Sequence, residues 1–248
     1  MIAASRLRSA QKSLSYARSF EQRIASAIDH SICHVKDLSQ IQKKIGVTNL
    51  IFVVASERGL CGGYNSSIFK LARSNHAFLS NDTKIVCVGK KSYDYCKNLG
   101  PECIFLSIDS DFAKMKSFVL KLITDFKIAS VTLLYTKFKS AMSLVPTAEQ
   151  IFPVKFDQGA KKSCTTCGFE PDATEVVSKL LDQHLFAKLY LALKESLTSE
   201  HMSRMLAMDS ATKNAQKVVD ELRLKYNLSR QEKITRELIE IISGAEAI

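Results

Sequence analysis

The chain has 248 residues, of which 46% are hydrophobic and 24% are charged, and this ordinary composition excludes extensive disorder. It contains no run of about 18 apolar residues that could cross a bilayer, so any membrane association has to come through a partner or a surface contact. The net charge of +10 would suit a nucleic-acid binder or a partner of acidic subunits, but the positive residues are spread thinly and form no Lys/Arg block interleaved with aromatic residues.

The first predicted element is a long helix over residues 1–45. This stretch contains neither Gly nor Pro, and Gly46 follows it. Small or apolar residues recur in it at steps of three and four, with a lapse at Glu21 and Ser31. They are Ala3, Leu7, Ala10, Leu14, Ala17, Ile24, Ile28, Val35 and Leu38. This spacing is typical of the narrow apolar seam of a coiled coil rather than of the wider stripe of a globular helix.

Between residues 46 and 156 the pattern changes from a helical period to short apolar runs. Runs at 50–55, 85–88, 103–106 and 131–135 are separated by helical patterns at 67–79 and 112–126. Strands that alternate with helices indicate a parallel sheet covered by helices, because parallel strands need a crossover connection. We therefore predict a small Rossmann-like α/β domain. An extended exit is expected around Pro146 and Pro153, since the residue before a proline is kept out of the helical region.

Residues 157–170 form a polar predicted linker that carries Gly159 and Gly168. The pair Cys164 and Cys167 has the spacing of a zinc site or a redox dithiol, but no second pair completes four ligands. The chain has seven cysteines, an odd number scattered through hydrophobic segments, which indicates reduced thiols rather than a disulfide framework. We expect a linker with incidental cysteines, and redox regulation remains the alternative hypothesis.

A second long helix is predicted over residues 171–248. Pro171 suits a first helical turn, and Asp172 and Glu175 place acidic groups near the positive end of the helix dipole. Because no further Gly or Pro occurs before Gly244, roughly 72 residues at about 1.5 Å each would give a rod of about 110 Å. Its second half carries a seam at Met205, Met208, Ala211, Ala215, Val218, Leu222, Tyr226, Ile234, Leu238, Ile241 and Ala245.

Together these elements predict an antiparallel coiled coil of the two terminal helices with the small α/β domain between them. Two helices that each carry a narrow seam bury it most economically on each other. The longer helix should extend past its partner. An extended tip rich in Ile, Leu and Ala has to be covered by another protein, so the sequence predicts an obligate partner.

Four sequence islands resemble the gamma subunits of F-type ATP synthases. One is the carboxyl-terminal run 234–247, with an Ile-Thr pair, two spaced acids and a closing Gly-Ala. The others are the runs 204–215 and 224–231, and the loop 57–65, which reads Glu-Arg-Gly-Leu-Cys-Gly-Gly-Tyr-Asn. Residues 3–7, Ala-Ala-Ser-Arg-Leu, are also similar to the first helix of that family. The resemblance therefore runs from end to end, and these islands are specific when they occur together in order.

The resemblance implies a non-catalytic rotary shaft inside a ring of alpha and beta subunits. Its globular part would lie beside an epsilon-type subunit and the membrane rotor ring of c subunits. The implied location is the cytoplasmic face of a bacterial inner membrane, with the mitochondrial matrix side as the alternative, and no cofactor, metal or nucleic acid is expected. The residues implied as contacts between shaft and ring are Arg204, Arg230, Gln231, Thr235, Glu237 and Glu240.

Family members usually begin several helical turns earlier, with a basic segment that has no counterpart before Met1. We expect that the true start codon lies upstream, because a seam without a partner from about Met205 onward would forgo several kcal/mol of burial at ~25 cal/mol per Å². For the same reason the basic opening is interpreted as the middle of a helix and not as a transit peptide.

Two other functions remain open from the residues alone. The loop 58–65, with Arg58, Gly59, Gly62 and Gly63, could belong to a small nucleotide-binding protein, although its spacing fits neither common phosphate-binding pattern. A structural turn is the preferred interpretation of these four residues. The net charge also allows a basic coiled-coil scaffold or adaptor.

Overall fold

The computed structural model describes residues 2–32, 34–35, 46, 48–75, 82–99, 102–107, 117–119, 121, 128–154 and 172–246. Within these ranges no helix is both long enough and apolar enough to cross a membrane. The predicted linker 157–170, including Cys164 and Cys167, lies outside them, as does the end of the first predicted helix at 36–45.

The centre of the fold is a five-stranded mixed sheet with the strand order β3-β2-β1-β4-β5. Its strands are β1 (Thr48–Val54), β2 (Thr83–Val88), β3 (Glu102–Leu106), β4 (Ile128–Ser140) and β5 (Ser143–Phe152). Strands β1 to β4 pair in parallel, as predicted, whereas β5 pairs antiparallel with β4. The predicted extended exit is therefore a strand of the sheet. Its Pro146 is tolerated because β5 is an edge strand, where one missing donor does not break a ladder.

Both faces of the sheet are covered, which explains why its strands are continuous apolar runs. Leu50, Phe52 and Val54 of β1 point to one face, while Ile51 and Val53 point to the other. Helices α2 (Tyr64–Ser74) and α3 (Lys90–Cys96) contribute to the core on the second face. The first face packs against the amino-terminal part of helix α5 (Ala173–Glu246), through Leu185, Phe186, Leu189 and Ala192.

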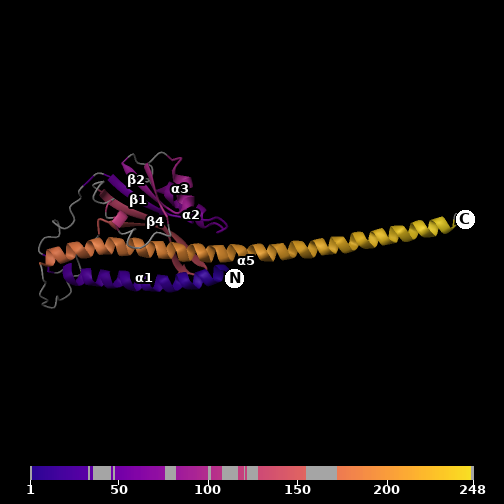
Figure 1. Cartoon of the computed structure of the whole chain (residues 1–248), viewed down its shortest axis with the longest axis horizontal. Coiled ribbons are helices and arrows are strands. Elements are labelled where there is room, and N and C mark those ends of the chain that lie inside the picture. Colours follow the sequence, from indigo (N-terminus) through magenta and orange to yellow (C-terminus); the bar gives the residue numbers. More distant parts are fainter. Residues whose placement is uncertain are drawn as a thin grey trace. The chain divides into compact units, whose positions relative to one another are not determined.

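Helix α1 (Ile2–Ile32) runs antiparallel to the part of α5 that precedes Met205 (Figure 1). Arg18 forms an ion pair with Glu195, and Glu21 forms one with Lys188. Further along α1, Ile24 and Ile28 pack with Ala187, Leu180 and Leu181. Residues later in α1 therefore contact residues earlier in α5, which is the predicted antiparallel arrangement.

The apolar seam of α1 is buried, and the two polar residues that interrupt it in the sequence, Glu21 and Ser31, are buried with it. Leu7, Ala10, Leu14, Ala17, Glu21, Ile24, Ile28 and Ser31 are all buried, at steps of three and four. Glu21 is accommodated by Lys188 Nζ at 3.0 Å, and the Ser31 hydroxyl donates to the Ala27 carbonyl at 2.8 Å. The heptad is therefore continuous, and polar groups occupy two of its positions because each has a partner.

The bounds of several elements differ from the sequence expectation. Helix α1 ends at Ile32, before the predicted end at residue 45, and a turn follows in which His34 N donates to the Ser31 carbonyl. Helix α3 was not predicted. The predicted helix at 112–126 is described only at 117–119 and 121, which are helical. The proposed division into 1–45, 46–156, 157–170 and 171–248 stays a prediction.

The chain separates into two compact units, Met1–Met205 and Leu206–Ile248. The first contains α1, the sheet, α2, α3 and the start of α5. The second is the remainder of α5, and along it the predicted seam is exposed, including Val218, Leu222, Tyr226, Ile234, Leu238 and Ile241.

Acid should weaken the first unit through His184, which is half-buried on α5. Burial lowers the pKa of His184 below its ordinary value of 6.5, and the charge of Lys188 acts in the same direction, while Glu21, Asp29 and Glu149 oppose the shift. Between the lowered pKa and 6.5 the unfolded chain binds a proton that the folded chain does not, so the free energy of unfolding falls as the pH drops.

We therefore expect the unfolding temperature of the wild-type chain to fall between about pH 7.5 and about pH 5.5, and that of the H184Q variant to fall less. Thermal unfolding followed by circular dichroism checks this. An unchanged pH dependence in H184Q would assign the effect to another group.

Candidate functional site: the 56–65 loop, the Arg204 turn and the carboxyl-terminal helix

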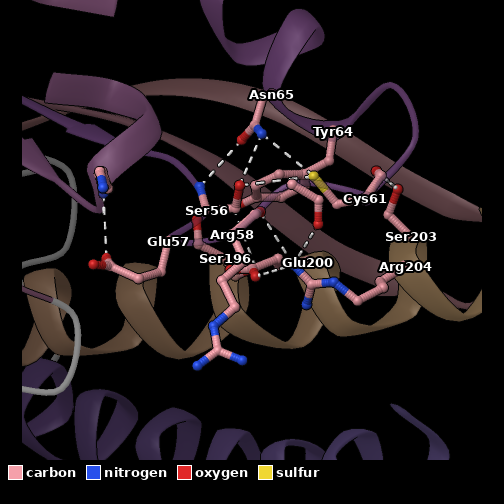
Figure 2. Close-up of polar contacts among 12 residues, drawn as sticks. Ser56, Glu57, Arg58, Cys61, Tyr64, Asn65, Ser196, Glu200, Ser203 and Arg204 are labelled. Atoms are coloured by element: carbon pink, nitrogen blue, oxygen red, sulfur yellow. Dashed lines mark hydrogen bonds and ion pairs between the residues drawn. The ribbon is translucent and has the colours of Figure 1, made fainter. Parts of the chain in front are cut away.

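The first candidate site is the loop that follows β1, together with the turn of α5 that it touches (Figure 2). The loop turns sharply, because Leu60 and Gly62 both adopt positive φ values, 61° and 57°. Left-handed backbone is costly for most side chains, which explains the glycine at position 62. Leu60 adopts this conformation while its side chain is 77% exposed.

Replacing Gly62 by alanine should lower the free energy of unfolding by about 1–2 kcal/mol, because a Cβ atom is disfavoured in the left-handed region. The matched control is Gly59→Ala. A Cβ at Gly59 would meet nothing within 4 Å, and its φ is not positive, so this change should be nearly neutral. Chemical unfolding of the two variants measures the difference, and equal losses would contradict the role assigned to Gly62.

The loop is tied to the sheet and its helices by Asn65 and by main-chain bonds. The Asn65 side chain accepts from Ser56 N at 3.1 Å and donates to the Ser56 hydroxyl at 2.8 Å. On the other side, Lys91 N donates to the Ser56 carbonyl at 3.1 Å, and Lys90 N donates to the Glu57 carboxylate at 3.2 Å. The loop is therefore held by β1, α2 and α3 together.

Helix α5 binds the opposite side of the loop through Ser203 and Arg204. Figure 2 shows both side chains reaching from the helix toward the loop. The Ser203 hydroxyl donates to the Cys61 carbonyl at 2.6 Å. Arg204 Nη2 donates to the carbonyls of Arg58 and Gly59 at 3.3 and 3.4 Å. The same nitrogen lies 2.6 Å from Glu200 Oε1, one helical turn earlier.

Glu200 carries a buried carboxylate, and this burial affects its pKa. Burial raises the pKa of Glu200, and the charge of Glu57 adds to this, whereas the hydrogen bond and charge of Arg204 oppose it. The guanidinium is thus held by a carboxylate on its own helix while it binds the loop.

The loop presents carbonyl groups to α5, and this favours the structural turn over the nucleotide-binding hypothesis. A phosphate site needs main-chain amides or cations aimed at an anion. Here the carbonyls of Arg58, Gly59 and Cys61 are the groups that meet the helix. No group of three or more His, Cys, Asp or Glu residues suited to a metal occurs in the part of the chain that the structure describes.

The second candidate site is the surface of the Leu206–Ile248 unit, which carries five of the six predicted contact residues. Arg230, Gln231, Thr235, Glu237 and Glu240 are all exposed. At 100° per residue, Ile234, Leu238 and Ile241 fall along one line of the helix. Arg230 and Glu237 then lie on one side of that line, and Gln231 and Thr235 on the other. Exposed polar groups therefore flank the exposed seam, and Leu228, Ile239 and Ile242 add exposed apolar groups on the side of Gln231 and Thr235.

The structure separates the sixth predicted contact residue, Arg204, from the other five. It belongs to the first unit, and its guanidinium already binds the loop and Glu200. Ser203 and Glu200 were not predicted from the sequence as site residues, whereas Asn65 lay at the end of the predicted loop. The sequence signal that could have indicated a buried polar contact is the polar run 195–200, which lies in a helix that packs on a sheet. By itself, this run looks like a solvent-exposed helix face.

Comparison with known proteins agrees with this architecture. A chain in the structure of the Tetrahymena thermophila mitochondrial ATP synthase central stalk and c-ring has a TM-score of 0.61 and 23% identity, over 86% of this chain and 96% of that one. A chain in the Euglena gracilis mitochondrial ATP synthase also has a TM-score of 0.61, with 16% identity over 99% of this chain and 93% of that one. At these identities the likeness concerns the fold alone.

The sequence comparisons define the family. A family model described as ATP synthase matches residues 1–248. The ATP synthase gamma chain of Sinorhizobium medicae is 36% identical over 266 residues, and that of Pelagibacter ubique is 35% identical over 266 residues. Each alignment covers 100% of this chain and 91% of the relative. The chain belongs to the ATP synthase gamma chain family.

Proposed function

We propose that this chain is the central rotary shaft of an F-type ATP synthase, which couples proton-driven rotation of a membrane rotor ring to ATP synthesis and hydrolysis in the catalytic subunits. The chain itself then catalyses no reaction. The observation that carries the proposal is the Leu206–Ile248 unit, a helix whose apolar seam is exposed in the isolated chain.

An exposed seam of this kind needs a protein cover. Leu238 is 54% exposed and Ile241 is 68% exposed, and similar residues recur along the helix. Exposed apolar surface on this scale marks an interaction site. The proposed cover is a sleeve formed by the alpha and beta subunits of the synthase head. Within it, the exposed polar residues that flank the seam serve as contacts, and Arg204 is the sixth proposed contact.

The asymmetry of this helix suits it to transmit rotation. A catalytic subunit that faces the Ile234 and Leu238 line meets apolar side chains, whereas one that faces Arg230 and Glu237 meets charges. A conformational equilibrium shifts only when the two states differ in contact free energy with the bound partner. Turning the shaft therefore changes which state each catalytic subunit favours. Charged and amide contacts also depend on orientation, which limits permanent adhesion.

The remaining partners and the location follow from the same proposal. An epsilon-type subunit and the c ring would bind the first unit, and no nucleic acid partner is involved. The chain would be a peripheral component on the cytoplasmic face of a bacterial inner membrane, held there by the complex, or on the matrix side of a mitochondrial membrane.

Assembly with the head subunits tests the proposal. When the purified chain is mixed with the isolated alpha and beta subunits of its own synthase, we expect a stable, ATPase-active head that contains the chain. Failure to form such a head contradicts the shaft function. Saturable nucleotide binding by the chain alone would favour the nucleotide-binding alternative, and steep salt-dependent binding to arbitrary DNA would favour the scaffold.

A further inference from the structure

We propose that the 58–61 loop and the Arg204 turn of α5 form a torsional lock, which prevents α5 from turning about its own axis against the sheet. Arg204 is the positioning residue of this lock. The usefulness of such a lock rests on the proposed shaft function, whereas its existence can be measured in the chain alone.

The torsional lock lies at the end of the part of α5 that belongs to the first unit. Arg204 is in the last turn of α5 that belongs to the first unit, which ends at Met205. In a shaft, torque carried by α5 has to be resisted at this point. Apolar packing through Phe186 and Leu189 holds the helix on the sheet, but the hydrophobic effect that drives this packing is non-directional. Hydrogen bonds depend on angle and can fix the rotational setting of the helix.

The acceptors in the lock are main-chain carbonyls, which cannot swing away with a side-chain rotamer. Arg204 Nη2 reaches two of them, on Arg58 and Gly59, and the Ser203 hydroxyl reaches a third, on Cys61. Glu200 holds the guanidinium in place from the previous turn of the helix. The loop in turn is fastened to β1, α2 and α3 through Ser56 and Asn65, so a twist of α5 would have to deform the sheet domain.

A second set of polar contacts opposes rotation from the β4 side. The Ser196 hydroxyl accepts from Thr136 N at 3.2 Å, and the Ser199 hydroxyl donates to the Thr136 carbonyl at 3.3 Å. The Tyr64 hydroxyl donates to the Ser196 carbonyl at 3.2 Å. Residues 196–204 of α5 are therefore held by hydrogen bonds with β4, with α2 and with the loop. Before residue 196 the contact of α5 with the sheet is mainly apolar and includes the ion pair between Lys188 and Glu149 of β5 at 3.3 Å.

Hydrogen exchange in the isolated chain tests whether the lock exists. In R204A we expect the amides of Ser56, Tyr64 and Lys91, whose hydrogen bonds hold the loop, to exchange roughly tenfold faster than in the wild type, because the charge-assisted bonds between α5 and the loop are lost. R204K keeps the positive charge, but its shorter side chain ends before the position of Nη2, the atom that reaches both the loop carbonyls and Glu200, so it should also exchange faster than the wild type. The control is K179A, which breaks the exposed Lys179–Glu175 pair of the same helix, also 2.6 Å long and also at i,i+4. Wild-type exchange in R204A or R204K would overturn the lock.

Angular fluctuation of the rotor in the assembled synthase tests what the lock does. With the head immobilised, a bead on the first unit and rotation stalled without nucleotide, we expect R204A and R204K to widen the angular distribution relative to wild type and K179A. Loss of packing alone would lower thermal stability without this widening. If the wild-type chain itself assembles no rotating complex, the shaft function fails. If the wild-type complex rotates and R204A has the same angular distribution as K179A, the lock is contradicted and the shaft function is not.

Discussion

Substituting Leu238 and Ile241 together by glutamate should abolish assembly of an ATPase-active head and leave the folding of the isolated chain unchanged. Both side chains are more than half exposed in the chain, so they contribute little to its own stability. In the proposed sleeve the same side chains are buried, and two carboxylates there would have no partner, which costs several kcal/mol each.

The measurement is gel filtration of the variant mixed with alpha and beta subunits, followed by ATPase assay. The matched control is Lys213→Glu together with Lys217→Glu, two changes of greater charge at exposed polar positions of the same helix. We expect the control to assemble. A double-glutamate variant that assembles normally would show that the seam is not the surface covered by the head.

Replacing Arg18 by alanine should lower the free energy of unfolding by about 3 kcal/mol. Arg18 Nη2 lies 2.8 Å from Glu195 Oε1 and also donates to the Phe138 carbonyl at 2.6 Å. The Glu195 side chain is only 2% exposed, so removing the guanidinium leaves a buried carboxylate without its counter-charge. Urea unfolding of the isolated chain measures the loss.

Two further variants separate this ion pair from a general effect of removing arginine. Arg23→Ala, an exposed position on the same helix, should change the free energy of unfolding by less than about 0.5 kcal/mol. The double variant R18M/E195M should regain most of the loss, because a buried ion pair can be replaced by apolar side chains at little cost. If R18A unfolds like R23A, α1 does not depend on this contact with α5.

The helical seam and the apolar strands could be predicted because their signals are local. Leu7, Leu14 and Ile28 recur at the period of a coiled coil, and the run 50–55 of β1 is continuous because both faces of the sheet are covered. The lapses at Glu21 and Ser31 could not be interpreted from sequence alone. Whether a polar residue at a seam position is buried depends on a partner such as Lys188, which is far away in the chain.

The elements that could not be predicted from the sequence are stabilised by residues that are distant from them in the chain. Helix α3 is short and mostly polar, and its first amides are held by Ser56 and Glu57 of the loop. Strand β5 contains Pro146, which argues against a strand unless the strand lies at an edge. The binding of the loop by Ser203 and Arg204 joins residues more than a hundred positions apart. No local pattern predicts such a contact.

Direct observation of rotation tests the shaft function most directly. A biotin acceptor peptide inserted after Met142, which is 97% exposed at the tip of the β4–β5 hairpin, would carry a bead on the first unit while the alpha and beta subunits are fixed to a surface. With ATP we expect the bead to turn in one direction in discrete steps, and the Leu238/Ile241 double-glutamate variant to give no rotating beads. A head that hydrolyses ATP at the full rate while the bead on this chain stays still would contradict the account.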